Sequence, residues 1–191
     1  MLRVDFNRQL NHINQEVVLL ADVVDKATGR AVEALRTRDL VESQKVVEED
    51  DYIDSKRYEI EELCLDLMAT QQPMAGDLRA IIALLHITVE LERMGDYAEG
   101  IAKISLLMGD DPPLKPLIDI PRMADRATQM LRSSIDSLLE RDEVKARQVL
   151  VDDDEVDALY DQVYRELLLF MIQDPRSIQR ATYLLLSLIH I

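Results

Sequence analysis

Two segments that lie 103 residues apart repeat one pattern of apolar residues, and an aspartate interrupts both at the same place. Alternating steps of four and three residues put each set of positions on one stripe of an α-helix. The interrupting residues are Asp50 and Asp153. A carboxylate in an apolar stripe is costly unless a metal or a basic side chain offsets its lost hydration. The two stripes are Val46, Asp50, Ile53, Arg57, Ile60, Cys64 and Leu67, and Val149, Asp153, Val156, Tyr160, Val163, Leu167 and Phe170.

The composition favours an all-α protein. The 191 residues include only 5 glycines, 6 prolines and no tryptophan, and aromatic residues make up 4%. The single cysteine, Cys64, excludes a disulfide framework and indicates a buried thiol in a reducing cytoplasm. No run approaches the roughly 20 apolar residues of a membrane span, so a cytoplasmic location is predicted.

The net charge of −15 argues against non-specific nucleic-acid binding, which depends on Lys and Arg neutralising phosphates. Cations or basic partner surfaces fit an acidic chain better. Most of the 37 acidic residues are nonetheless expected on solvated helix faces.

Helix boundaries repeat as well, 103 residues apart for the N-caps and 102 residues apart for the prolines that follow. The first helix shows a stripe of three- and four-residue steps that is typical of a helical bundle. Asp39 and Asp142 are predicted N-caps of the second and fifth helices, Pro73 ends the second helix, and Asp174 caps a turn that begins at Pro175. The first stripe is Leu10, Ile13, Val17, Leu20, Val24, Ala27, Ala31 and Ala34.

The chain is predicted to consist of two tandem three-helix bundles. The first covers residues 1–109 and ends near Gly109, a Pro-rich linker covers 110–121, and the second covers 122–191. Pro121 is expected to start the fourth helix. The second copy stops before counterparts of Glu92 and Asp96, so its last helix is expected to be incomplete, through truncation or altered terminal residues.

Acidic residues that are spaced four apart share a helix face, and three such pairs are Asp50 and Asp54, Glu92 and Asp96, and Asp153 and Asp157. Like charges at this spacing weaken a helix unless a cation bridges them, and oxygen-only ligands suit hard metal ions. The alternatives are an exposed salt-bridged face, or neutralisation by Arg57 and Arg93. The candidate metal ligands are Asp50, Asp54, Glu92, Asp96, Asp153 and Asp157.

An enzyme with a carboxylate-bridged pair of metal ions is a weaker alternative. Such bundles place Glu-x-x-His on facing helices, and none of the three histidines has a glutamate three positions before it. No phosphate-binding glycine loop, nucleophile elbow or zinc-binding spacing is present either. The chain is therefore predicted not to be an enzyme.

Two segments in the first unit closely resemble the signature of the PhoU family of phosphate-transport regulators. They are residues 72–79 (QPMAGDLR) and residues 91–102 (LERMGDYAEGIA). The resemblance covers nearly the whole chain and includes both repeats. It implies a regulator of two three-helix bundles, each with a metal site on its surface that is built from Glu/Asp-x-x-x-Asp motifs.

The resemblance assigns Asp50, Asp54, Glu92 and Asp96 to the first metal site and Asp153 and Asp157 to half of the second. The metal would be iron, zinc, manganese or magnesium. Gly100 stands where relatives often carry asparagine, which could leave the first site one oxygen ligand poorer.

The resemblance further implies repression of the phosphate-starvation response and of phosphate uptake. Its expected partners are PstB, the ATPase of the phosphate ABC transporter, and the sensor histidine kinase PhoR. A homodimer is expected, with contact to the membrane only through partners. The alternative is an acidic helical adaptor that binds basic partner surfaces without metal.

Overall fold

The computed structural model describes residues 2–109, 112 and 114–191 of the chain. Within these residues the chain forms six α-helices and one short 3-10 helix and has no β-strand, which confirms the predicted all-α fold. The elements are α1 (Leu2–Thr37), α2 (Leu40–Gln71), α3 (Gly76–Met108), α4 (Asp119–Glu140), α5 (Glu143–Gln173), η1 (Pro175–Ser177) and α6 (Ile178–Ile189).

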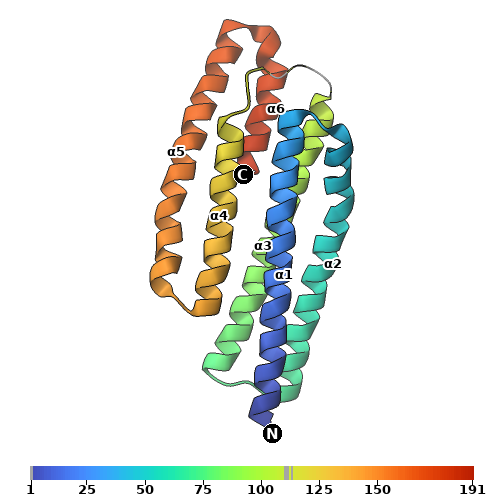
Figure 1. Ribbon diagram of the computed structural model, residues 1–191, viewed down its shortest axis with the longest axis vertical. Coiled ribbons are helices and arrows are strands. Elements are labelled where there is room, and N and C mark those ends of the chain that lie inside the picture. Colours follow the sequence, from blue (N-terminus) through green and yellow to red (C-terminus); the bar gives the residue numbers. More distant parts are fainter. Residues whose placement is uncertain (1, 110–111, 113) are drawn as a thin grey trace.

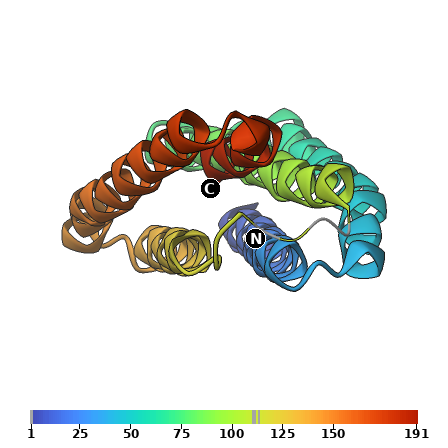
Figure 2. The same cartoon turned by 90° about the horizontal axis from the view of Figure 1, so that it is seen from above.

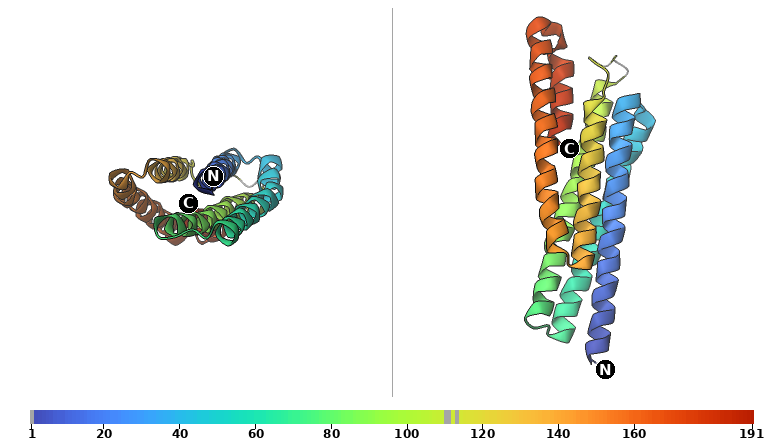
Figure 3. Two further views of the ribbon diagram at one scale, coloured as in Figure 1. Left: turned by 90° about the horizontal axis from the view of Figure 1, so that it is seen from below. Right: turned by 60° about the vertical axis from the view of Figure 1, so that its left-hand side comes forward.

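The helices form two antiparallel three-helix units that lie side by side (Figure 1). Seen along the helices, α5, α6, α3 and α2 form a curved layer (Figure 2). Helices α1 and α4 run in opposite directions on the concave side of this layer, and the further views in Figure 3 show the same arrangement. The units therefore meet where α1 contacts α4 and where α3 contacts α6.

The predicted helix caps are confirmed. Asp39 accepts a hydrogen bond from the backbone N–H of Glu42 at 2.9 Å, and Asp142 accepts one from Lys145 at 3.0 Å. Asp174 caps the 3-10 turn through the N–H of Arg176. Each carboxylate satisfies an N–H group that the first turn of a helix leaves unpaired.

Helix α4 begins two residues earlier than predicted, at Asp119 rather than Pro121. Proline is tolerated in the first turn because the N–H that it lacks would have no intrahelical partner there. Pro121 is thus an early residue of the helix and does not mark its start.

The apolar stripes of α1 and α2 are buried along their length, whereas that of α5 is not. Helix α2 buries all five apolar members of its stripe. Helix α5 buries Val163 and Leu167 of its stripe, while Val149, Val156 and Phe170 stay partly exposed. Helix α6 lies against α5 near the turn that joins them and does not cover the first half of α5 (Figure 1).

The hydrophobic core continues from one unit into the other. One cluster joins Ala31 of α1 and Ile101 of α3 to Met123, Val163 and Leu184 of the second unit. Because each unit completes the core of the other, the interface is part of the packing that stabilises the fold. The division at residues 110–121 stays a prediction.

An ion pair joins the two units. Arg132 of α4 donates from Nε and a terminal nitrogen to Asp25 of α1, at 3.1 and 2.7 Å. On the side of the second unit, the partly buried Lys115 of the linker ion-pairs with Glu166 of α5 and Asp119 of α4. Asp110, Asp111 and Pro113 of the predicted linker lie outside the described residues.

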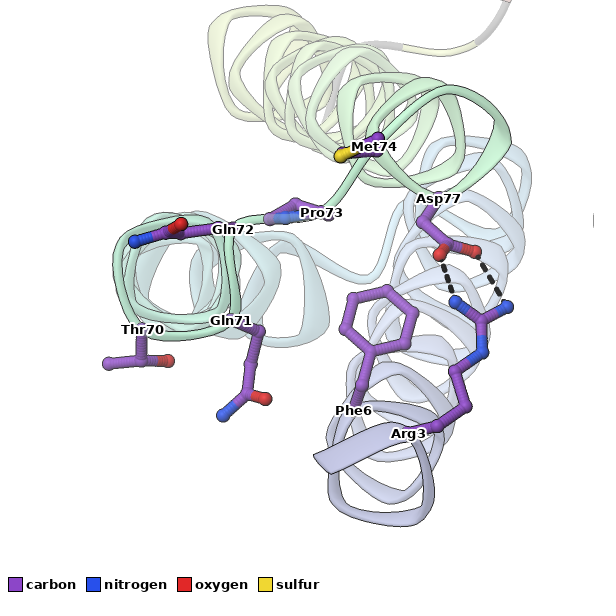
Figure 4. Close-up of a pocket in the computed structure, with 8 residues that line it drawn as sticks. All are labelled: Arg3, Phe6, Thr70, Gln71, Gln72, Pro73, Met74 and Asp77. Carbon is purple, nitrogen blue, oxygen red and sulfur yellow. Dashed lines mark hydrogen bonds and ion pairs between the residues drawn. The ribbon is translucent and has the colours of Figure 1, made fainter. Parts of the chain in front are cut away.

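The turn between α2 and α3 forms a pocket of about 460 Å³ against the start of α1 (Figure 4). Arg3 ion-pairs with Asp77 and lies over the ring of Phe6. Gln72 ends α2 in the left-handed region, and Ala75 has φ 50° and ψ −113°. That conformation is normally adopted by glycine, so Ala75 is strained.

None of the described helices combines the length and apolarity needed to cross a bilayer.

Replacing Ala75 with glycine is expected to stabilise the protein by about 1 kcal/mol. The gain is the strain removed, roughly 1–3 kcal/mol, less the extra freedom that glycine gives the unfolded chain. Urea unfolding would measure it. Ala69→Gly, at an exposed position inside α2, is the control and should destabilise by about 1 kcal/mol. Equal destabilisation by both changes would show that Ala75 is not strained.

Candidate functional site

Three predicted metal-ligand residues from two helices come together on the first unit. One carboxylate oxygen each from Asp50 and Asp54 of α2 and Asp96 of α3 lie within 4.8 Å of one another. In the part of the chain that the structure describes, this is the only such group of three or more His, Cys, Asp or Glu residues. We call these three residues the acidic trio.

Helix packing places the trio. Asp50 and Asp54 are one turn apart on α2 and so face the same way. Asp96 follows Gly95, and a Cβ atom at Gly95 would lie 2.9 Å from Cγ2 of Ile53 and 3.5 Å from Oδ1 of Asp50. The missing side chain therefore lets α3 approach α2 closely beside Asp50.

The trio is electrostatically unfavourable when all its members are ionised. Burial, followed by the charges of Glu99, Asp54 and Asp96, raises the pKa of Asp50 to about 6. Burial and the charges of Asp54 and Glu99 also raise the pKa of Asp96, while Lys103 opposes the shift. Removing the carboxylates from water and placing them side by side both disfavour their charged forms.

Glu92 lies beside the trio and does not belong to it. Burial and the charge of Asp96 raise the pKa of Glu92, and Arg57 lowers it. The two arginines considered as counterions have other carboxylate partners. Arg57 ion-pairs with Glu61 at 3.2 Å, and Arg93 ion-pairs with Glu90 at 2.8 Å.

Glu99 is a residue of the site that the sequence analysis did not identify. After burial, its charge is the largest influence on the pKa of Asp50. Glu99 and Asp50 also line a cavity of about 120 Å³ between α1, α2 and α3. Its position three residues after Asp96 was the available signal, because such residues are neighbours on a helix surface.

The predicted ligands of the second unit are arranged differently. Asp153 and Asp157 are exposed on α5. Asp153 lines an apolar groove of about 430 Å³ between α3, α4 and α5, which Ile191 also lines. Helix α6 covers neither residue, so their role as metal ligands stays a prediction.

Gly100 faces the end of the chain. A Cβ atom at this position would lie 2.7 Å from Cδ2 of His190, whose ring also makes an edge contact with Tyr97. A side chain at position 100 would therefore displace His190 from α3.

Comparisons with known proteins agree on one family. A sequence profile described as "PhoU domain" matches residues 17–105 and 120–191. The PhoU homologue of Aquifex aeolicus, named a phosphate-specific transport system accessory protein, is 38% identical over 93% of this chain and 80% of its own length. The Rhizobium meliloti protein of the same name is 32% identical over 94% of this chain and 76% of its own length.

Solved structures share the fold. A crystal structure of PhoU from Pseudomonas aeruginosa superposes with a TM-score of 0.92 at 29% identity, over 97% of this chain and 89% of that chain. The phosphate transport system regulatory protein PhoU from Streptococcus pneumoniae gives 0.89 at 25% identity, over 97% and 87%. These relatives are named accessory or regulatory proteins of phosphate transport, not enzymes.

The contact at Gly95 can be isolated with two alanine substitutions. Both Gly95→Ala and Gly29→Ala gain about 1 kcal/mol of helix propensity. Only Gly95→Ala overpacks a buried side chain, because nothing lies within 4 Å of a Cβ at Gly29. Urea unfolding should show Gly29→Ala stabilised and Gly95→Ala destabilised, each by about 1 kcal/mol. Equal changes in the free energy of unfolding for the two variants would show that α2 and α3 can move apart at this contact without cost.

The metal-free protein is expected to lose stability as the pH rises through about 6. The folded state holds the Asp50 proton more tightly than the unfolded chain does. The stabilisation that this proton gives is fully present below the ordinary pKa of 3.8 and is lost as the pH rises through about 6. The free energy of unfolding of Asp50→Asn should equal that of wild type near pH 4 and exceed it by about 1–2 kcal/mol above pH 7. Solvent screening keeps the difference below the value that the full pKa shift would give.

Urea unfolding in the presence of EDTA at several pH values would measure this difference. Asp66→Asn, at an exposed position on the same helix, is the control and should give a nearly constant difference. A pH-independent gain for Asp50→Asn would mean that its carboxylate ionises normally in the folded protein.

Proposed function

This chain belongs to the PhoU family and is an accessory or regulatory protein of phosphate transport, and from that premise we propose that it is a metal-binding negative regulator. In this proposal it represses the phosphate-starvation response and phosphate uptake by contact with PstB and PhoR. A cytoplasmic location and a homodimer belong to the same proposal.

The acidic trio is the observation that carries the metal-binding part. It joins three carboxylates from two helices, and burial together with the charges of neighbouring carboxylates raises the pKa values of Asp50 and Asp96. A dication would relieve the repulsion and favour the ionised forms. An all-oxygen donor set fits a hard ion such as magnesium, manganese or ferric iron better than zinc, which also accepts nitrogen and sulfur ligands.

Asp50, Asp54 and Asp96 would hold the metal, and Glu92 is close enough in the structure to influence the same site. A bound ion supplies positive charge. Because Asp96 lies on α3 and the other two lie on α2, shared ligation would tie these helices together. Asp153 and Asp157 are proposed as half of a second site on α5.

Coupling to partners would follow from charge. The chain carries a net charge of −15, and a cation at the trio changes the local field that a basic partner surface meets. Metal occupancy would thus alter both the rigidity of the α2–α3 face and its affinity for PstB or PhoR. A metal-free acidic adaptor would bind the same partners with no such dependence.

Replacing Asp50, Asp54 and Asp96 together with asparagine is expected to abolish metal binding at the first unit and leave helicity intact. The variant removes all three charged ligands and keeps side chains of nearly the same size. Elemental analysis and calorimetric titration with Mn²⁺, with circular dichroism for folding, would measure the outcome. A decrease in Mn²⁺ affinity of at least 100-fold is expected.

The matched control changes Glu62 to Gln and Asp66 to Asn, which are exposed and spaced one turn apart on the same helix. This control should bind Mn²⁺ as wild type does. PstB and the cytoplasmic part of PhoR would then be titrated with the wild-type protein, with and without Mn²⁺. Absence of metal from wild type after reconstitution, with partner binding retained, would overturn the metal proposal in favour of the adaptor.

A further inference from the structure

The surroundings of Asp50 contain a fourth carboxylate that the Glu/Asp-x-x-x-Asp spacing does not include. Glu99 lies three residues after Asp96 on α3, and its side chain is only 19% exposed. It lines the same small cavity as Asp50, together with Lys26 and Arg30 of α1. Its Oε1 atom ion-pairs with Nζ of Lys103 at 2.5 Å.

We propose that Glu99 is a further ligand of the metal held by the acidic trio, and that Lys103 is the counterion which the metal displaces from Glu99. This inference rests on the proposed metal binding and extends it to two residues outside the family motif. It makes the site a place where a resident ammonium group and a metal ion compete for one carboxylate.

The position of Glu99 supports a ligand role. Asp96, Glu99 and Lys103 follow one another at steps of three and four residues, so they occupy adjoining positions on one side of α3. The contact at Gly95 brings this side of α3 close to Asp50. Glu99 therefore lies near Asp50 and on the same helix as Asp96, although its carboxylate is not among the oxygens that lie within 4.8 Å of one another. A rotation of its flexible side chain would change which cation it meets.

Lys103 has the properties of a replaceable counterion. Its side chain is 55% exposed, so its ammonium group can return to water at little cost. Lys103 offsets the repulsion within the site only in part, since its charge lowers the pKa values of Asp50 and Asp96 and both nevertheless remain raised. A dication among four carboxylates would outweigh a single exposed lysine in the competition for Glu99.

The proposal predicts opposite effects for two substitutions. Glu99→Gln should weaken Mn²⁺ binding about 10-fold or more, because the site loses a charged ligand. Lys103→Met should tighten it about 3- to 10-fold, because the metal no longer competes with an ammonium group. Calorimetric titration with Mn²⁺ at pH 7.5 and low salt would measure both affinities, and urea unfolding would check that the variants are folded.

Opposite signs separate ligation from a structural role. Both substitutions remove the Glu99–Lys103 ion pair, so a purely structural pair would shift metal affinity in the same direction in the two variants. The double variant adds a second criterion, because Lys103→Met should have a smaller effect when Glu99 is already Gln. Glu90→Gln on the same helix and Lys45→Met on α2 are matched controls and should leave affinity unchanged.

The outcomes distinguish this inference from the function on which it rests. If wild type binds no Mn²⁺, both proposals are overturned. If wild type binds Mn²⁺ and the Asp50, Asp54 and Asp96 variant does not, while Glu99→Gln binds as wild type does, only the role of Glu99 is wrong. Weaker binding by Lys103→Met would overturn the displacement of Lys103.

Discussion

The close packing of α3 on α2 at Gly95 is the contact on which the acidic site depends. Ile53 fills the space that a side chain at Gly95 would need, and Asp50 lies at the edge of the same contact. This arrangement places carboxylates of two helices within ligand distance and withdraws Asp50 partly from water. The packing energy of the bundle therefore holds together charges that would otherwise repel.

The two units differ in whether a neighbouring helix packs closely beside the aspartate of the repeated stripe. Asp50 and Asp153 occupy the same position in the repeated stripe, yet Asp50 is half-buried and Asp153 is exposed. The difference arises from the covering helix. Helix α3 approaches Asp50 closely at Gly95, whereas Asp153 lines an apolar groove between α3, α4 and α5.

The two units share one core. The apolar cluster and the Asp25–Arg132 ion pair cross between them and join α1 to α4. A continuous core of this kind provides a physical route by which the packing of one unit depends on that of the other.

The sequence by itself determined the all-α fold, the repeat, the caps at Asp39 and Asp142, and the acidic spacing. These features are local, because helix periodicity and capping depend on residues only a few positions apart. The tertiary structure alone decided that Glu99 lies near Asp50, that Glu92 lies outside the acidic trio, and that α5 is only partly covered. Those outcomes depend on which helix faces pack together and how closely, and side-chain spacing along one helix does not contain that information.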